Sequence, residues 1–174
     1  MYLISIYFDE ETDRHIRSYI NSIAKASGNT SMLDGAVPPH ITIAAFRAES
    51  ESIANEIFRS GAKKISGGMV QWVSCGCFFP SVIYAAPLLN EYLHQISEIY
   101  NKELIQREGI YIDNRYQPFH WFPHTTLGKH LSQEQLGEAF AAMQKSFGSF
   151  AGRVEKIGLA KTNPYMDLEV LDLK

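Results

Sequence analysis

Two short stretches of the chain repeat one order of residues and place a histidine two positions before a threonine. They are Pro39-His40-Ile41-Thr42-Ile43, the first phrase, and Pro123-His124-Thr125-Thr126-Leu127, the second phrase. In a β-strand, residues i and i+2 point to the same face, so each phrase presents an imidazole beside a hydroxyl. Imidazole titrates near neutral pH, so two of them at one site can supply a proton acceptor and a proton donor together.

This pair of phrases fits in-line displacement at phosphorus. A neutral imidazole takes a proton from the attacking water or hydroxyl, and a protonated imidazole gives one to the departing oxygen. Thr42 and Thr126 can donate hydrogen bonds to non-bridging phosphate oxygens. We therefore expect His40 and His124 to be the general acid and base. No metal is needed, since proton transfer and fixed donors handle the change in charge.

Composition limits the class of protein. The chain has 174 residues, 45% of them hydrophobic, which fits one globular domain. Its formal net charge of −3 argues against a broad basic surface that follows a long nucleic acid, while a small phosphate ligand or an RNA end is compatible with it. The beginning lacks the pattern of a signal peptide and no stretch has the length of a membrane helix, so we expect a cytoplasmic protein.

Apolar spacing and turn residues predict alternating strands and helices. The expected strands are 2–8, 40–46, 65–79, 82–86, 122–129, 153–161 and 166–173. The expected helices are 13–26, 50–59, 88–105 and 132–147. Gly28 is a natural end for the first helix. Pro87 stands where a helix would favour it as its first residue, and Ser132 with Gln135 forms a capping-box pattern.

The order of elements around the two phrases is similar, which indicates an internal duplication. A helix precedes each phrase, and a second helix and two strands follow it. We expect an α+β fold, a single domain over residues 1–174 with two lobes related by a pseudo-twofold. The sheet should be mostly antiparallel, with outer helices, a shared central cleft and the option of exchanged terminal strands.

The twice-written H-x-T-apolar phrase, about eighty residues apart, resembles the two-histidine phosphoesterase superfamily, which includes the 2′-5′ RNA ligase-like (LigT-like) proteins and cyclic nucleotide phosphodiesterases. The resemblance implies the bilobal fold, His40 and His124 as acid and base, and Thr42 and Thr126 as phosphate ligands. It also implies a substrate with a 2′,3′-cyclic phosphate or a 2′-5′ phosphodiester, in a nucleotide or at an RNA end. No cofactor, membrane or obligate protein partner is implied, and we expect a monomer.

Other side chains are weaker candidates for the same cleft. Aromatic rings that could stack on a base, as in readers of single-stranded RNA, are Tyr7, Phe46, Tyr84, Phe119 and Trp121. Cations that could meet a phosphate are Arg47, Arg115 and Lys129. Thr125 is expected to point away from the His124 face, as an ordinary strand former.

Two alternatives remain from the sequence. A non-catalytic protein could use the same cleft to hold a nucleotide or an RNA end, although a pure binder needs no acid and base together. His120 and His124 have the spacing of a metal pair on a helix, but Pro118 and Pro123 disfavour a helix there. Cys75 and Cys77 lack partner cysteines, so a zinc site is not expected.

Overall fold

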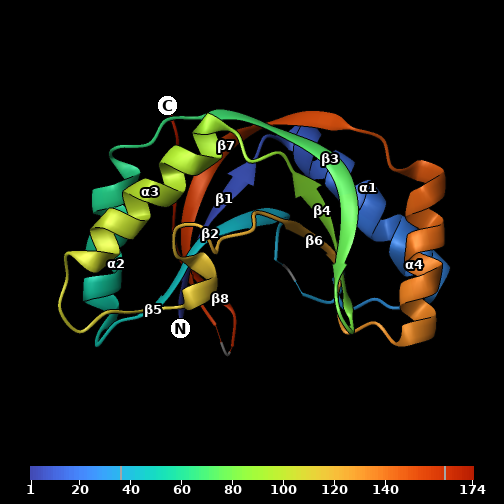
Figure 1. Cartoon of the computed structure of the whole chain (residues 1–174), viewed down its shortest axis with the longest axis horizontal. Helices are drawn as coiled ribbons and strands as arrows, with labels where there is room; N and C mark the ends of the chain where they lie inside the picture. Colours follow the sequence, from blue (N-terminus) through green and yellow to red (C-terminus); the bar gives the residue numbers. More distant parts are fainter. Residues whose placement is uncertain (36, 163) are drawn as a thin grey trace.

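The computed structural model describes residues 1–35, 37–162 and 164–174. The predicted helices and strands are present, β5 and η1 are additional, and together the elements form an arch (Figure 1). In chain order the elements are β1 (Tyr2–Phe8), α1 (Glu10–Ser27), β2 (His40–Arg47), α2 (Glu51–Ala62), β3 (Gly68–Phe78), β4 (Val82–Pro87), α3 (Glu91–Ile105), β5 (Tyr111–Ile112), the 3-10 helix η1 (Asn114–Tyr116), β6 (Thr125–Gly128), α4 (Gln133–Ser146), β7 (Phe150–Lys161) and β8 (Met166–Asp172).

The strands form one antiparallel sheet, as predicted. Its order is β5-β2-β1-β7-β3-β4-β6, with β8 paired to β7. The long strand β7 joins the two lobes, because Val154 pairs with Phe8 of β1 and with Gly68 of β3. The sheet curls until β2 and β6, which lie near its two ends, come into contact. This curvature brings the strands that follow the two histidines to the same place.

Two pairs of helices cover the arms of the arch. Helix α1 packs against α4, and α2 packs against α3 (Figure 1). Each pair therefore takes one helix from each half of the chain. The two halves of the chain are thus interleaved in space, since α1, which follows β1, packs against α4 and contacts β6.

Local sequence explains where most helices begin and end. Asp9 caps α1 by accepting a 2.8 Å hydrogen bond from the Thr12 amide, and Gly28 ends the helix with a left-handed φ of 67°. Ser132 and Gln135 form the predicted capping box of α4. The prediction that Pro87 opens a helix was wrong. Pro87 ends β4, and α3 starts after the cap Asn90.

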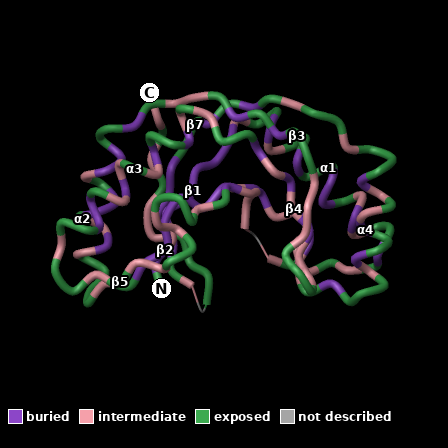
Figure 2. Tube along the Cα trace, viewed as in Figure 1, coloured by how far each residue is buried: buried purple, intermediate pink, exposed green. Residues whose placement is uncertain are grey.

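The core lies between the sheet and its helices, where the chain trace is mostly buried (Figure 2). Its largest fully buried side chains include Trp72, Tyr100, Phe46 and Phe58. Burial of rings of this size supplies much of the hydrophobic stabilisation of a domain. A rigid core on one side of the sheet leaves the opposite face free for a site.

Trp72 fixes the second phrase to the core. Its indole N–H donates a 3.0 Å hydrogen bond to the Thr125 hydroxyl, and both side chains are fully buried. The prediction that Thr125 points away from the His124 face is confirmed. Since neighbouring strand residues face opposite ways, this bond directs Thr126 toward the open face of the sheet.

We expect Thr125→Val to lower the free energy of unfolding by about 1–3 kcal/mol, because it leaves the buried Trp72 donor without a partner. Urea denaturation followed by circular dichroism measures the change. Thr126→Val, on the opposite face of the same strand, is the matched control and should cost less. Equal losses for the two variants would contradict the account of how this strand is oriented.

Candidate active site

The first phrase begins β2, directly after two prolines that hold the chain extended. His40 Nδ1 lies 2.8 Å from the carbonyl oxygen of Pro38. A carbonyl can only accept, so Nδ1 carries the hydrogen and Nε2 is the nitrogen left for proton transfer.

The second phrase has the same contact between the histidine Nδ1 and a backbone carbonyl. His124 Nδ1 lies 2.9 Å from the carbonyl oxygen of Phe122, again two residues earlier in the chain. Its Nε2 is therefore also the free nitrogen. Both imidazole rings are partly exposed. The two phrases therefore share the same hydrogen bond and the same tautomer of the histidine.

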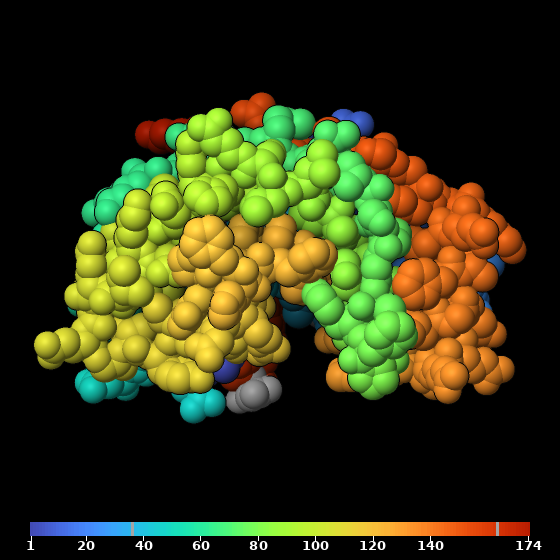
Figure 3. Space-filling model, in the orientation of Figure 1, coloured from blue at the N-terminus to red at the C-terminus, as the bar shows by residue number. Residues whose placement is uncertain are grey.

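The two phrases meet across the curled sheet. The Trp121 indole N–H, three residues before His124, donates a 3.0 Å hydrogen bond to the carbonyl oxygen of Thr42. The charge of His124 is one of the causes that lower the pKa of His40. The surface is hollowed between the tip of the β3–β4 hairpin and the segment around residues 113–122 (Figure 3).

Burial is the main cause that lowers the pKa of both histidines. For His40, the hydrogen bond to Pro38 and the charge of Asp167 oppose the shift, whereas His124 and Lys129 add to it. For His124, the hydrogen bond to Phe122 opposes the shift and the charge of Arg115 adds to it. Desolvation disfavours the charged imidazolium. Both rings therefore lose their protons more readily than free imidazole does.

The two threonines of the phrases differ in environment. Thr42 is buried, and its hydroxyl lies 3.3 Å from that of Ser5 on the neighbouring strand. Thr126 is only partly buried and pairs with Tyr84 across β4 and β6. To hold a phosphate oxygen, Thr42 would have to share or give up its contact with Ser5, whereas Thr126 is the more exposed of the two.

Each histidine has a tyrosine beside it on the adjacent strand. The Tyr7 ring centroid is 6.2 Å from that of His40, and the Tyr84 centroid is 5.7 Å from that of His124. Each tyrosine ring lies over a glycine, where a Cβ atom would approach within 3 Å: Tyr7 over Gly158 and Tyr84 over Gly76. These two predicted candidates occupy related positions in the two lobes.

A cavity of about 300 Å³ adjoins His124. Two predicted candidates, Arg115 and Trp121, line it, together with His120. Phe78 and Phe122, which sequence reasoning missed, line it as well. Phe122 lies two residues before His124, so its closeness in the chain was the available signal. Phe78 comes from the distant β3–β4 hairpin, and the sequence held no signal for it.

Three weaker candidates lie elsewhere. Phe46 is fully buried against Tyr2, so its assignment as a stacking ring was wrong. Phe119 is fully exposed and lies in a different hollow, beside α3. The Arg47 guanidinium lies over the ring of Tyr111, 5.8 Å from its centroid, at the far end of β2 from His40.

Within the described residues, no three side chains of His, Cys, Asp or Glu are grouped so as to hold a metal ion. The stretch between His120 and His124 is not helical, so the i, i+4 geometry of a helical metal pair does not arise. None of the helices in the described ranges is long and apolar enough to cross a membrane.

No family model matches the chain, and no curated protein matches its sequence. Solved structures, in contrast, match over almost its whole length. LigT of E. coli, complexed with 3′-AMP, has a TM-score of 0.64 at 17% identity, over 99% of this chain and 97% of LigT. TT0787 of Thermus thermophilus has a TM-score of 0.63 at 16% identity, over 99% and 97% of the two chains.

This chain has the LigT fold. The fold implied by the resemblance of the two phrases is therefore confirmed. Usb1 of Kluyveromyces marxianus matches more distantly, with a TM-score of 0.51 at 11% identity over 99% of this chain and 96% of Usb1. At such identities the likeness to LigT is one of fold, and the chemistry depends on the residues described above.

If the charge of His124 acts on His40, replacing His124 should change the pKa of His40. In His124→Gln the positive charge near His40 is gone, so the pKa of His40 should rise. A pH titration of the histidine resonances by NMR measures it, with His94→Gln on α3 as the control. An unchanged pKa of His40 in His124→Gln would show that the rings lie too far apart to interact, and a lower pKa would contradict the expected sign.

Proposed function

We propose that the protein is a phosphodiesterase that acts on a 2′,3′-cyclic phosphate or a 2′-5′ phosphodiester, in a nucleotide or at an RNA end. The observation that carries this proposal is the matched pair of histidines. Each has Nδ1 engaged by the carbonyl two residues earlier and Nε2 available. Two imidazoles with the same tautomer suit a reaction in which one ring accepts a proton at Nε2 and the other donates a proton from Nε2.

In the proposed reaction, water attacks phosphorus in line with the departing ribose oxygen. One histidine accepts the water proton at neutral Nε2, and the other donates its Nε2 proton to the oxygen whose bond to phosphorus breaks. The hydroxyls of Thr42 and Thr126 donate to the non-bridging oxygens, where negative charge develops. The product is a phosphomonoester, and the two histidines have exchanged protonation states. No metal takes part in this scheme.

Proteins with the same fold support the substrate class. LigT of E. coli has been crystallised with 3′-AMP, with phosphate and with ATP. Another solved structure, with a TM-score of 0.64 at 15% identity, is described as a phosphoesterase. Each of these ligands contains phosphate, and 3′-AMP and ATP also contain an aromatic base. The proposed substrate of this chain contains the same two groups.

We expect His40→Ala and His124→Ala each to lower kcat for a 2′,3′-cyclic nucleotide by about a hundred- to ten-thousand-fold, as loss of a general acid or base does. Hydrolysis is measured by chromatography in the presence of EDTA. His94→Ala on α3 serves as the control and should keep wild-type turnover. Wild-type turnover in both cleft variants would refute the assignment, and binding without turnover in the wild type would favour a nucleotide-binding protein.

The lowered pKa values predict an acid-shifted pH profile. Activity requires one neutral and one protonated imidazole. Because burial makes both rings lose protons at lower pH, that state is most abundant below the ordinary imidazole value of about 6.5. The profile of kcat/KM, which reports the free enzyme, should be bell-shaped with its maximum below that value. A maximum well on the alkaline side would contradict the proposed pair.

A further inference from the structure

The surroundings of the two histidines differ, although the phrases are alike. On the His124 side, the rings of Phe78, Tyr84 and Phe122 gather around the imidazole. Ring centroids of Phe78 and Phe122 lie 4.8 and 6.5 Å from that of His124, and Phe122 is close to parallel with it, at 21°. Phe78 is 39% exposed and Phe122 is 48% exposed, so apolar rings at the cavity stay open to water. Open aromatic surface beside a polar group is typical of a ligand site.

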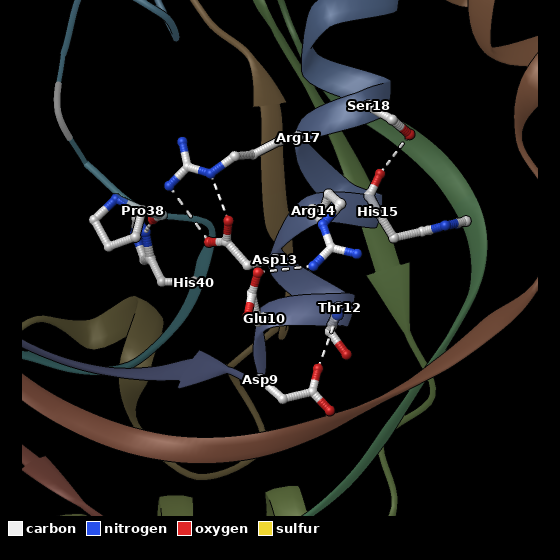
Figure 4. Close-up of polar contacts among 10 residues, drawn as sticks. All are labelled: Asp9, Glu10, Thr12, Asp13, Arg14, His15, Arg17, Ser18, Pro38 and His40. Atoms are coloured by element: carbon white, nitrogen blue, oxygen red, sulfur yellow. Dashed lines mark hydrogen bonds and ion pairs between the residues drawn. The ribbon is translucent and has the colours of Figure 1, made fainter.

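The His40 side offers a different surface. A hollow of about 450 Å³ there is lined by Tyr7 and Pro38, and its charged walls include Glu155, Lys156 and Asp167. Asp13 of α1 also lines it and accepts a hydrogen bond from Arg17 (Figure 4). The Tyr165 hydroxyl donates a 2.7 Å hydrogen bond to Asp167 and lies 3.4 Å from that of Tyr7. Carboxylates on this side repel a phosphate, so it is the less favourable exit for an RNA strand.

A guanidinium is held in place on the His124 side. Arg115 donates from Nε and Nη2 to the two carboxylate oxygens of Asp113, at 3.0 and 2.7 Å. Asp113 is thereby neutralised, and no partner for Nη1 is found in the parts of the chain that the structure describes. Arg115 lines the cavity with Phe122 and lowers the pKa of His124, so its charge lies near that ring. A fixed guanidinium beside aromatic rings suits a phosphate next to a stacked base.

We propose that this cavity is the subsite for the nucleobase attached to the reacting ribose, and that Arg115 contacts the next phosphate along the strand. The base stacks on Phe122 with Phe78 at its edge, so any of the four bases is accepted. The preferred substrate is then the end of an RNA strand that leaves the cleft on the His124 side, in preference to a free cyclic mononucleotide. This inference rests on the proposed function and makes it more specific.

The first test separates the base from the reacting group. Phe122→Ala should lower kcat/KM for a 2′,3′-cyclic mononucleotide about tenfold, the usual effect of losing one stacking ring. It should lower kcat/KM for methyl riboside 2′,3′-cyclic phosphate, which has no base, by a clearly smaller factor. Phe79→Ala is the matched control, since that ring is 83% exposed at the tip of the hairpin and lies outside the cavity lining. Equal effects of Phe122→Ala on both substrates would overturn the base subsite.

The second test concerns the strand. Wild-type kcat/KM should be about tenfold higher for a trinucleotide ending in a 2′,3′-cyclic phosphate than for the mononucleotide, as one charged hydrogen-bonded contact would give. Arg115→Gln should bring the ratio of the two kcat/KM values close to one. The ratio is the readout, because the Arg115 charge also lowers the pKa of His124 and its loss acts on both substrates. Equal values for the two substrates in the wild type, or an advantage that persists in Arg115→Gln, would overturn the role of Arg115.

A binding measurement keeps this inference separate from the proposed function. A 3′-phosphorylated, fluorescently labelled trinucleotide is titrated with wild type, Phe122→Ala and Arg115→Gln, and anisotropy gives Kd. Weaker binding by both variants supports the subsite even if no cyclic phosphate is hydrolysed, in which case only the proposed reaction fails. An unchanged Kd in both variants would contradict the proposed subsite even if the protein hydrolyses a cyclic phosphate.

Discussion

The hydrogen bond from each histidine Nδ1 to the carbonyl two residues earlier is the constraint on which the site depends. It fixes the tautomer, and it orients the ring from its own backbone without help from a distant side chain. The prolines that precede each histidine hold the chain in the extended form that this bond requires. The local motif fixes the orientation of each ring. The rest of the fold has only to bring the two motifs close together.

The curled antiparallel sheet brings the strands β2 and β6 of the two phrases into contact. β2 and β6 lie near opposite ends of the strand order, and their contact closes the arch. The Trp121–Thr42 hydrogen bond ties the two ends together, and the Trp72–Thr125 bond fixes the face on which the second phrase opens. Buried aromatic packing thus determines where the chemistry is presented, although none of these bonds involves an imidazole.

Local rules predicted much of this structure, because they act over a few residues. The i, i+2 rule predicted the paired histidine and threonine, and capping chemistry predicted the ends at Gly28 and Ser132. Phe46 was misplaced for a physical reason: the pairing of β1 with β2 shifts between Ile4 and Ser5, and this irregularity turns the later residues of β2 to the core. Pro87 was misassigned since it pairs with Trp72 at the end of β4, a contact that no local pattern shows.

The parts of the site that the sequence did not indicate come from long-range packing. Phe78 reaches His124 only because the β3–β4 hairpin bends over the cavity, and Asp167 reaches the surroundings of His40 only because β8 lies beside β7. These contacts give the two histidines different surroundings. In the proposed reaction, the division of roles between acid and base would follow from this difference together with the orientation of the substrate.

The central claim is that two imidazoles act as a unit on a single phosphorus atom. A double-mutant cycle tests it most directly, with kcat for a 2′,3′-cyclic nucleotide measured for wild type, His40→Gln, His124→Gln and the double variant. Residues that act as a unit are strongly non-additive, so the double variant should be scarcely slower than either single variant. Independent effects that multiply in the double variant would contradict the claim.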